Sequence, residues 1–412
     1  MQPQQKSIWF SPSMMPMIFA KAKSWSLRQV EPRANGFWFL NLGRCEYLRN
    51  ESGFQKNPGS DTWMPLRVRD DVSTSLRMLL APRRVIHFVL VLVVSQVYAQ
   101  SDPLPSWNDG PAKKAIIEFI KKTTETGSPN FVRSEARIAT FDQDGTTWVE
   151  QPVSTQLVYY LERVPAVAEK RPELKTIEPF KTVLSGNRQA MARFTTRDIQ
   201  MILAASLTGI TVEEFKNEVK QWLATAKHPR FDRPYTDLTY EPMVELMKLF
   251  RSNGYKTYFV TGGGQDFVRT YSERTYGIPP EQVVASVAGI KYGYDKTGRP
   301  ILTKEPRLLF DDHGAGKPEA IHLAIGRRPY AAFGNSTGDK EMLEYTSAGD
   351  GARLAVLVLH DDARREYAYG PAQQLPDTKV GIFSQALYDE AKHKGWIVIS
   401  MKNDWKHIFS FE

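Results

Sequence analysis

FDQDGT, residues 141–146, ends a short apolar run over residues 136–141, and this stretch decides the fold. The run is typical of a buried strand, and side chains at i and i+2 of an extended segment point to the same side. Asp142 and Asp144 can therefore face one ligand. Two such carboxylates suit a hard cation, and one can attack phosphorus while the other protonates the leaving oxygen. A solvated Asp-Gly turn is the alternative if the motif stands alone.

A second apolar run, residues 255–260, is followed by Thr261-Gly-Gly-Gly. The Thr261 hydroxyl can bind a phosphoryl oxygen, and the amides of Gly262 and Gly263 can approach it closely because glycine lacks a Cβ atom. A plain glycine-rich turn is the alternative.

Two further stretches carry candidate site residues. Lys317 opens a predicted helix, and Gly334-Asn335-Ser336-Thr337-Gly338-Asp339 follows a predicted strand at residues 330–333. A single lysine is far more often a surface residue, so a role for Lys317 depends on the order and spacing of these stretches.

Helix and strand signals alternate downstream of residue 248. We expect a helix after residue 265, a strand near 282–287, a hairpin turn at 295–298, a strand at 354–359, a helix at 384–394 and a strand at 396–400. This alternation predicts an α/β fold with a mostly parallel sheet covered by helices on both faces. Asp109 is predicted to cap a first helix, and Thr211 with Glu214 forms a capping box within about a hundred mostly helical residues between the first two strands.

In their order, these motifs make the chain resemble the haloacid dehalogenase-like superfamily, specifically its phosphoserine-phosphatase-like branch. The resemblance implies a doubly wound, mostly parallel Rossmann-like core at residues 109–152 and 248–412, with a helical cap inserted at 153–247. It further implies that Asp142 is the nucleophile and Asp144 the acid/base. Thr261 and Lys317 would bind the phosphoryl group.

The same resemblance implies a Mg²⁺ site formed by Asp142, the Asp144 backbone carbonyl, Asn335 and Asp339. An aspartate is commoner at the position of Asn335, and the neutral amide is expected to weaken Mg²⁺ binding. A degenerate, inactive domain is the alternative. Asp144 favours phosphate-ester hydrolysis, because relatives that displace halide lack this second acid.

Substrate contacts are predicted at the start of the cap. Glu150 and Gln151 follow the nucleophile closely enough to reach a substrate, and Arg193 could meet an anionic leaving group. Arg188 and Arg197 are equivalent candidates, but arginines on an amphipathic helix are usually just a solvated face.

The basic charge lies at the N-terminal end. Residues 1–100 carry 13 Lys and Arg against 6 Asp and Glu, which leaves 41 against 40 in the remainder, so the net charge of +8 does not indicate a nucleic-acid partner. The only cysteine, Cys45, lies in the same part of the chain, so thiol chemistry is excluded from the domain that carries the motifs.

Residues 78–99 have a basic start, an apolar run at 85–94 and a small residue at Ala99, which together predict a signal peptide that leaves no stable membrane span after cleavage. Residues 1–77 are then a doubtful leader ahead of the true start at Met78. A buried strand at 85–94 in a genuine N-terminal domain is the alternative.

The sequence therefore predicts an exported, periplasmic or secreted, Mg²⁺-dependent phosphomonoesterase that acts on a small phosphorylated metabolite. A phosphotransferase to an alcohol and a non-hydrolytic phospho-ligand binding protein are the alternatives. The sequence does not indicate the oligomeric state.

Overall fold

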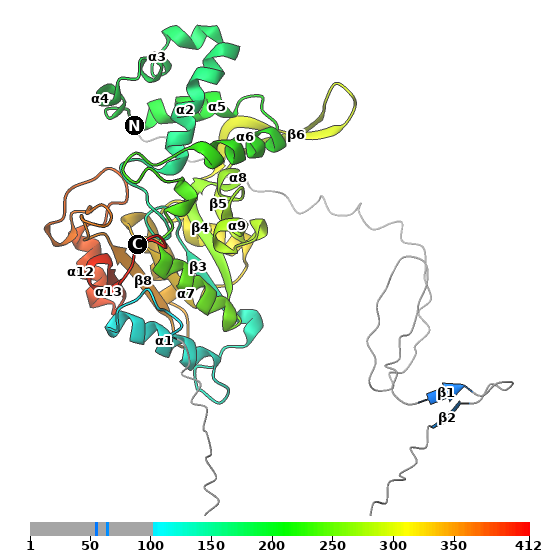
Figure 1. Ribbon diagram of the computed structural model, residues 1–412, viewed down its shortest axis with the longest axis vertical. Coiled ribbons are helices and arrows are strands. Elements are labelled where there is room, and N and C mark those ends of the chain that lie inside the picture. Colours follow the sequence, from blue (N-terminus) through cyan, green and yellow to red (C-terminus); the bar gives the residue numbers. More distant parts are fainter. Residues whose placement is uncertain (1–53, 57–62, 66–101) are drawn as a thin grey trace, which may run out of the picture. The chain divides into compact units, whose positions relative to one another are not determined.

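The computed structural model describes residues 54–56, 63–65 and 102–412 (Figure 1). The chain divides into two compact units, Met1–Val93 and Val94–Glu412. The first contains an antiparallel pair, β1 (Phe54–Lys56) and β2 (Trp63–Pro65). The predicted signal peptide lies outside the described residues, as does most of the predicted leader. Within the described residues, no helix combines the length and apolar character needed to cross a membrane.

The second unit is built on a seven-stranded sheet in the order β6-β5-β4-β3-β7-β8-β9. Every neighbouring pair is parallel except β5 with β6, which confirms the predicted α/β class and mostly parallel sheet. The strands are β3 (Ile138–Phe141), β4 (Lys256–Gly264), β5 (Val283–Tyr294), β6 (Pro300–Phe310), β7 (Ala331–Gly334), β8 (Leu354–Leu359) and β9 (Ile397–Ser400).

Helices cover both faces of the sheet, and further helices lie between β3 and β4 in the chain. They are α1 (Pro111–Thr124), α2 (Thr155–Lys170), α3 (Phe180–Leu184), α4 (Arg188–Met191), α5 (Thr196–Leu207), α6 (Val212–Thr225), α7 (Glu241–Ser252), α8 (Gln265–Val268), α9 (Ser272–Tyr276), α10 (Gly316–Ala324), α11 (Lys340–Ser347), α12 (Gln385–His393) and α13 (Met401–Asp404).

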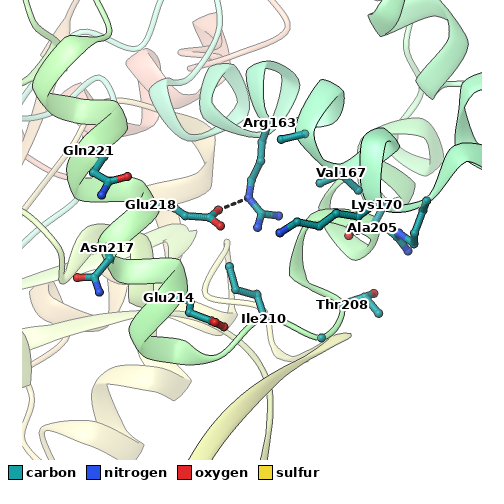
Figure 2. Close-up of a pocket in the computed structure, with 13 residues that line it drawn as sticks. Arg163, Val167, Lys170, Ala205, Thr208, Ile210, Glu214, Asn217, Glu218 and Gln221 are labelled. Atoms are coloured by element: carbon teal, nitrogen blue, oxygen red, sulfur yellow. Dashed lines mark hydrogen bonds and ion pairs between the residues drawn. The ribbon is translucent and has the colours of Figure 1, made fainter.

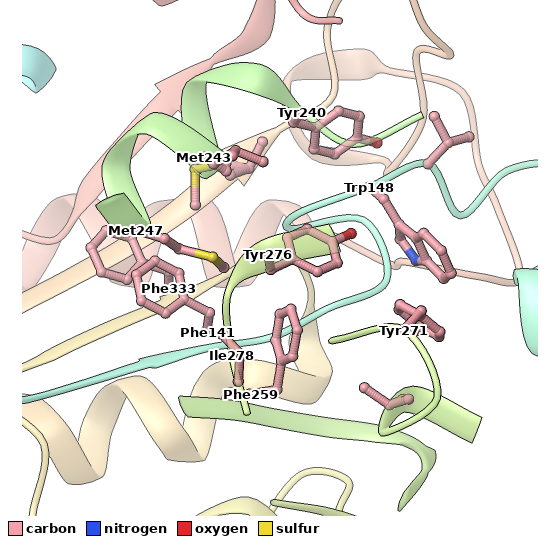
Figure 3. Packing of buried hydrophobic residues seen from close by; sticks show 14 of the residues in the cluster. Phe141, Trp148, Tyr240, Met243, Met247, Phe259, Tyr271, Tyr276, Ile278 and Phe333 are labelled. Atoms are coloured by element: carbon pink, nitrogen blue, oxygen red, sulfur yellow. The ribbon is translucent and has the colours of Figure 1, made fainter. Parts of the chain in front are cut away.

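Strand alternation explains the two-sided core. In β7, Phe333 joins the larger buried cluster with α1 and α7, whereas Ala332 points to the cluster formed with α10, α11 and α12. On the first face, the Phe141 and Phe333 rings stack 4.5 Å apart (Figure 3). Phe250 of α7 meets both rings edge-on. Continuous apolar strands are expected where helices bury both faces of a parallel sheet.

Helices α2 to α6 lie within the segment predicted to be a cap and group beyond one end of the sheet (Figure 1). The predicted capping box at Thr211 and Glu214 begins α6 as expected. Between α2, α5 and α6 lies a pocket of about 570 Å³ whose charged wall includes an ion pair of Arg163 with Glu218 (Figure 2).

The structure corrects one local prediction. Gly110, not Asp109, is the N-cap of α1, and it provides no side-chain cap. Asp109 instead accepts a hydrogen bond from Lys113 Nζ at 2.9 Å. Pro111 in the first turn lacks an N–H, so it reduces the number of amides that need a cap.

Candidate active site

The site forms where three adjacent parallel strands end. Asp142 follows β3, Thr261 lies near the end of β4, and Asn335 follows β7. The Asp142 amide donates to the Phe333 carbonyl at 2.8 Å, which fixes the nucleophile loop against β7. Carboxyl ends of parallel strands meet at one edge of a sheet, so residues nearly two hundred positions apart become neighbours.

Lys317, in the first turn of α10, connects these loops. Its Nζ donates to Asp142 Oδ1 at 2.6 Å and to the Val260 carbonyl at 2.7 Å, and it lies 2.7 Å from Asp339 Oδ1. The side chain is only 2% exposed. Burial alone would lower the pKa of Lys317, but Asp142 and Asp339 outweigh it and raise that pKa above its ordinary value. Lys317 is therefore a permanent buried cation at the nucleophile.

The two motif carboxyls have raised pKa values. Burial, followed by the charge of Asp339, raises the pKa of Asp142 to about 7 although Lys317 opposes this. Burial raises the pKa of Asp144 to about 6, while a hydrogen bond from Trp148 Nε1 to Asp144 Oδ1 at 2.6 Å favours its ionised form. A carboxyl that titrates near neutral pH is suited to both giving and taking a proton.

Trp148 is a site residue that the sequence analysis missed. Its indole stacks on the Tyr271 ring at 4.8 Å and holds the side chain of Asp144 from within the core (Figure 3). Its position four residues after Asp144 is the only local signal, and tryptophan alone predicts core packing.

Asn335 is oriented by its neighbours. Its Nδ2 donates to Glu150 Oε1 at 2.7 Å, and its Oδ1 accepts from Thr146 Oγ1 at 3.1 Å. Tyr369 donates to the same Glu150 oxygen at 2.8 Å. Burial, followed by the charge of Asp144, raises the pKa of Glu150 well above its usual value. Glu150, predicted to touch substrate, thus contacts the amide predicted to bind the metal.

Gly145 has to be glycine in this arrangement. Its φ is +72°, and a Cβ atom there would lie 2.1 Å from Asn335 Nδ2 and 2.2 Å from Glu150 Oε1. His360, directly after β8, brings its Nε2 within 2.7 Å of the Gly145 carbonyl, and its Nδ1 lies 3.1 Å from Glu366 Oε2. Because a carbonyl can only accept, Nε2 is the ring nitrogen that donates to the Gly145 carbonyl.

The donor set fits a divalent cation. Three buried carboxyl groups, those of Asp142, Glu150 and Asp339, and the half-buried carboxyl group of Asp144 belong to these loops, where Lys317 supplies the buried ammonium group. Positive charge is therefore in deficit, and oxygen ligands are those that Mg²⁺ prefers.

The predicted metal set mixes different kinds of oxygen. Among residues 102–412 and the two short strands before them, no three His, Cys, Asp or Glu side chains are arranged as a metal site. The set combines carboxylates with a backbone carbonyl and the amide of Asn335. Asp339 is already engaged, because its Oδ2 accepts the Asn335 and Ser336 amides at 3.0 Å and its Oδ1 faces Lys317.

The predicted phosphate loop is held from two sides. The Gly263 amide donates to Thr261 Oγ1 at 3.2 Å, and the Gly264 amide donates to Gln156 Oε1 of α2 at 2.7 Å. β4 extends through Gly264, so the glycines continue the strand instead of opening a helix at once. Thr261 itself is buried.

Asp312 was also missed. It is fully buried, and among the described residues neither of its carboxylate oxygens has a hydrogen-bond partner. Burial raises its pKa to about 7, while Lys317 opposes that shift. Its position after a long strand and five residues before Lys317 is the only signal in the sequence.

Two predicted substrate contacts lie farther out. Gln151 donates through Nε2 to the Val380 carbonyl at 2.9 Å and to Thr378 Oγ1 at 3.0 Å, so it joins the nucleophile segment to a C-terminal loop. Arg193 is exposed in the connection between α4 and α5.

Comparison with known proteins decides the family. A model described as haloacid dehalogenase-like hydrolase matches residues 139–344, half of the chain. The chain belongs to this family. The match spans all four motifs and confirms the predicted family and that the protein is a hydrolase. No match was found among curated proteins.

Several solved structures are similar to this member of the haloacid dehalogenase-like family. One, a conserved functionally unknown protein from Anaerococcus prevotii, shares 16% identity over 61% of this chain and 86% of its own, with a TM-score of 0.43. A protein with unknown function from Bordetella pertussis shares 16% identity over 64% and 97%, with a TM-score of 0.38. A phosphoserine phosphohydrolase-like protein from Francisella tularensis shares 17% over 55% and 89%, with a TM-score of 0.31.

Proposed function

We propose that this protein is a Mg²⁺-dependent phosphomonoesterase that forms an aspartyl-phosphate at Asp142 and acts on a small phosphorylated metabolite. One observation carries the proposal: Asp142 is buried at the end of the central strand and its Oδ1 accepts a hydrogen bond from buried Lys317 at 2.6 Å. A buried carboxylate next to a fixed cation is placed to attack phosphorus. The same cation can stabilise the negative charge of the phosphoryl oxygens.

The residues divide the reaction between them. Lys317 and the Thr261 hydroxyl bind the phosphoryl oxygens and align phosphorus with Asp142. A carboxylate oxygen of Asp142 forms the new bond to phosphorus as the bond to the leaving oxygen breaks, and Asp144 gives that oxygen its proton. Asp144, now ionised, takes a proton from water, which attacks phosphorus and releases phosphate from Asp142.

Mg²⁺, when bound, would offset the negative charge of the phosphoryl group and the carboxylates. Asp142, the Asp144 backbone carbonyl and Asn335 would hold it, with Asp339 contributing directly or through water. Because Glu150 accepts from Asn335 Nδ2, the amide oxygen of Asn335 is the atom left to face the cation.

The test is phosphate release from an aryl phosphate by the full chain, in Mg²⁺ and in chelator, beside Asp142→Asn. Release that requires Mg²⁺ and disappears in the variant is expected. Release by a folded Asp142→Asn variant at the normal rate would reject Asp142 as nucleophile. Added alcohols separate hydrolysis from transfer, because a transferase would form new phosphate esters in their presence.

Export is part of the proposal and rests on residues 78–99 of the sequence. The first residue of the protein purified from its native host tests it. A chain that starts at Gln100 would support export and cleavage after Ala99, whereas peptides from residues 1–77 in that sample would contradict the proposed start at Met78.

A further inference from the structure

We propose that an apolar cavity beneath α2, α4 and α5 receives the leaving group, so that the substrates are phosphomonoesters of apolar alcohols such as alkyl phosphates. This inference rests on the proposed function, because it names the substrate class of the same site.

The cavity has a volume of about 820 Å³, within the range of pockets that hold small molecules. Leu157 and Leu161 of α2 line one wall, and Met191, Phe194 and Ile199 line the opposite wall. Each of these five side chains is half-buried. They pack against the cap on one side and face the hollow on the other, so a ligand there would remove apolar surface from water.

Two separate stretches of chain connect the lining of the cavity with the phosphoryl site. Gln156 holds the Gly264 amide of the phosphate loop, and the next residue, Leu157, lines the cavity. On the nucleophile side, Glu150 contacts Asn335, and Pro152, two residues later, lines the cavity. Consecutive Cα atoms are 3.8 Å apart, so the Cα atoms of Leu157 and Pro152 lie within about 4 Å and about 7 Å, respectively, of those of Gln156 and Glu150, which contact the site loops.

A third contact ties the cavity to the site. Lys379 Nζ donates to the Ala192 carbonyl at 3.1 Å, and Ala192 lines the cavity. The neighbouring Val380 carbonyl accepts from Gln151. The C-terminal loop therefore contacts both a residue that lines the cavity and the nucleophile segment.

The lining favours an apolar occupant over a sugar or an amino acid. Its charged residues are Glu162, Arg188 and Lys227, and two of these are already engaged: Glu162 accepts from Trp222 Nε1 at 2.7 Å, and Lys227 pairs with Asp232 at 3.2 Å. Hydroxyl or amino groups of a polar leaving group would lose hydrogen bonds to water with few replacements. The pocket of Figure 2 differs from this cavity in its lining, which is charged and includes the ion pair of Arg163 with Glu218.

The experiment is a chain-length series. Phosphate release by the full chain in Mg²⁺ is measured for ethyl, butyl and hexyl phosphate, and kcat/KM is expected to rise up to about three- to fourfold per added methylene while the cavity fills. Leu161→Asn and Phe194→Asn should flatten this rise. Leu308→Asn, at a 60% exposed leucine of β6 that does not line the cavity, is the matched control and should keep the rise.

The outcomes separate this inference from the proposed function. Turnover of all three esters at equal kcat/KM would overturn the apolar cavity as leaving-group site and leave the phosphatase intact. Absence of turnover would count against the proposed function, and calorimetric titration with hexylphosphonate and ethylphosphonate in Mg²⁺ then decides the cavity. At least tenfold tighter binding of hexylphosphonate, lost in both cavity variants, would support it, and equal or absent binding would overturn it.

Discussion

Replacing Lys317 by methionine tests how strongly the site depends on one buried cation. In the wild type, Nζ lies 2.6 Å from Asp142 Oδ1 and 2.7 Å from Asp339 Oδ1, with the lysine side chain 2% exposed. Removing one partner of a buried ion pair typically costs about 3–5 kcal/mol, because the remaining charge has no compensation. Lys317→Met should therefore lower the free energy of unfolding by about this amount at pH 8.5 in chelator.

The loss should depend on pH. In the wild type, the pKa of Asp142 is raised to about 7 although Lys317 opposes the shift. Removing Lys317 would therefore raise the pKa of Asp142 further. Aspartate in the unfolded chain ionises near pH 4, so the stability of the folded chain falls as the pH rises from there toward the folded-state pKa of Asp142. Wild type and variant lose stability together up to about pH 7, and above that pH only the variant continues to lose it. Urea titrations at pH 6 and pH 8.5 measure the difference.

Lys394→Met is the matched control. Lys394 also contacts two carboxylates, Glu344 at 2.6 Å and Glu390 at 2.7 Å, but its side chain is 35% exposed. Exposed pairs contribute at most about 1 kcal/mol. A loss in Lys317→Met no larger than that of the control, or equal at both pH values, would refute the reasoning.

Three further predictions concern the acid, the metal ligand and the cation. Trp148→Phe removes a hydrogen bond to ionised Asp144 and should move the alkaline limb of the kcat/KM profile upward by roughly 1–2 pH units, and an unmoved limb would contradict this role. Asn335→Asp replaces the Nδ2 donor, which lies 2.7 Å from Glu150 Oε1, by a carboxylate oxygen, so two carboxyl groups face each other. Urea titration in chelator should therefore show that the free energy of unfolding falls by about 1–3 kcal/mol. Glu150→Gln in the same chain should recover it, and a double variant no more stable than Asn335→Asp would reject the contact. Mg²⁺ at a hundred times its Kd should stabilise the folded chain by about 2.7 kcal/mol in a thermal melt, reversibly with chelator, whereas no shift would count against a cation site.

The sequence predicts β3, β7 and β8 because these strands are short, apolar and bounded by polar residues. Residues 330–333 and 354–359 are observed as β7 and β8, and Ser384 caps α12 as its neighbours suggest. Competing local structure explains two differences from the predictions. The apolar run at 136–141 yields a strand only from Ile138, because residues 134–136 form a 3-10 turn, and Asp109 pairs with Lys113 instead of capping α1.

The site residues fall into two groups, those that the sheet topology brings together and those that depend on a loop. Asp142, Thr261, Lys317 and Asn335 stand at strand ends or helix starts, so their meeting follows from topology. The contact of His360 with the Gly145 carbonyl joins residues 215 positions apart, and that of Tyr369 with Glu150 joins residues 219 apart. These depend on how one C-terminal loop folds back, and no local pattern around either residue indicates it.

The most direct test of the account is to look for the phosphoryl group on Asp142. The full chain is mixed with an aryl phosphate in Mg²⁺, quenched in acid within a turnover and digested, and the peptide that contains residues 141–146 is analysed by mass spectrometry. A phosphoryl adduct on Asp142 that is absent from Asp142→Asn is the predicted result. Turnover with no adduct on this peptide, or with the phosphoryl group on another residue, would contradict the proposed mechanism.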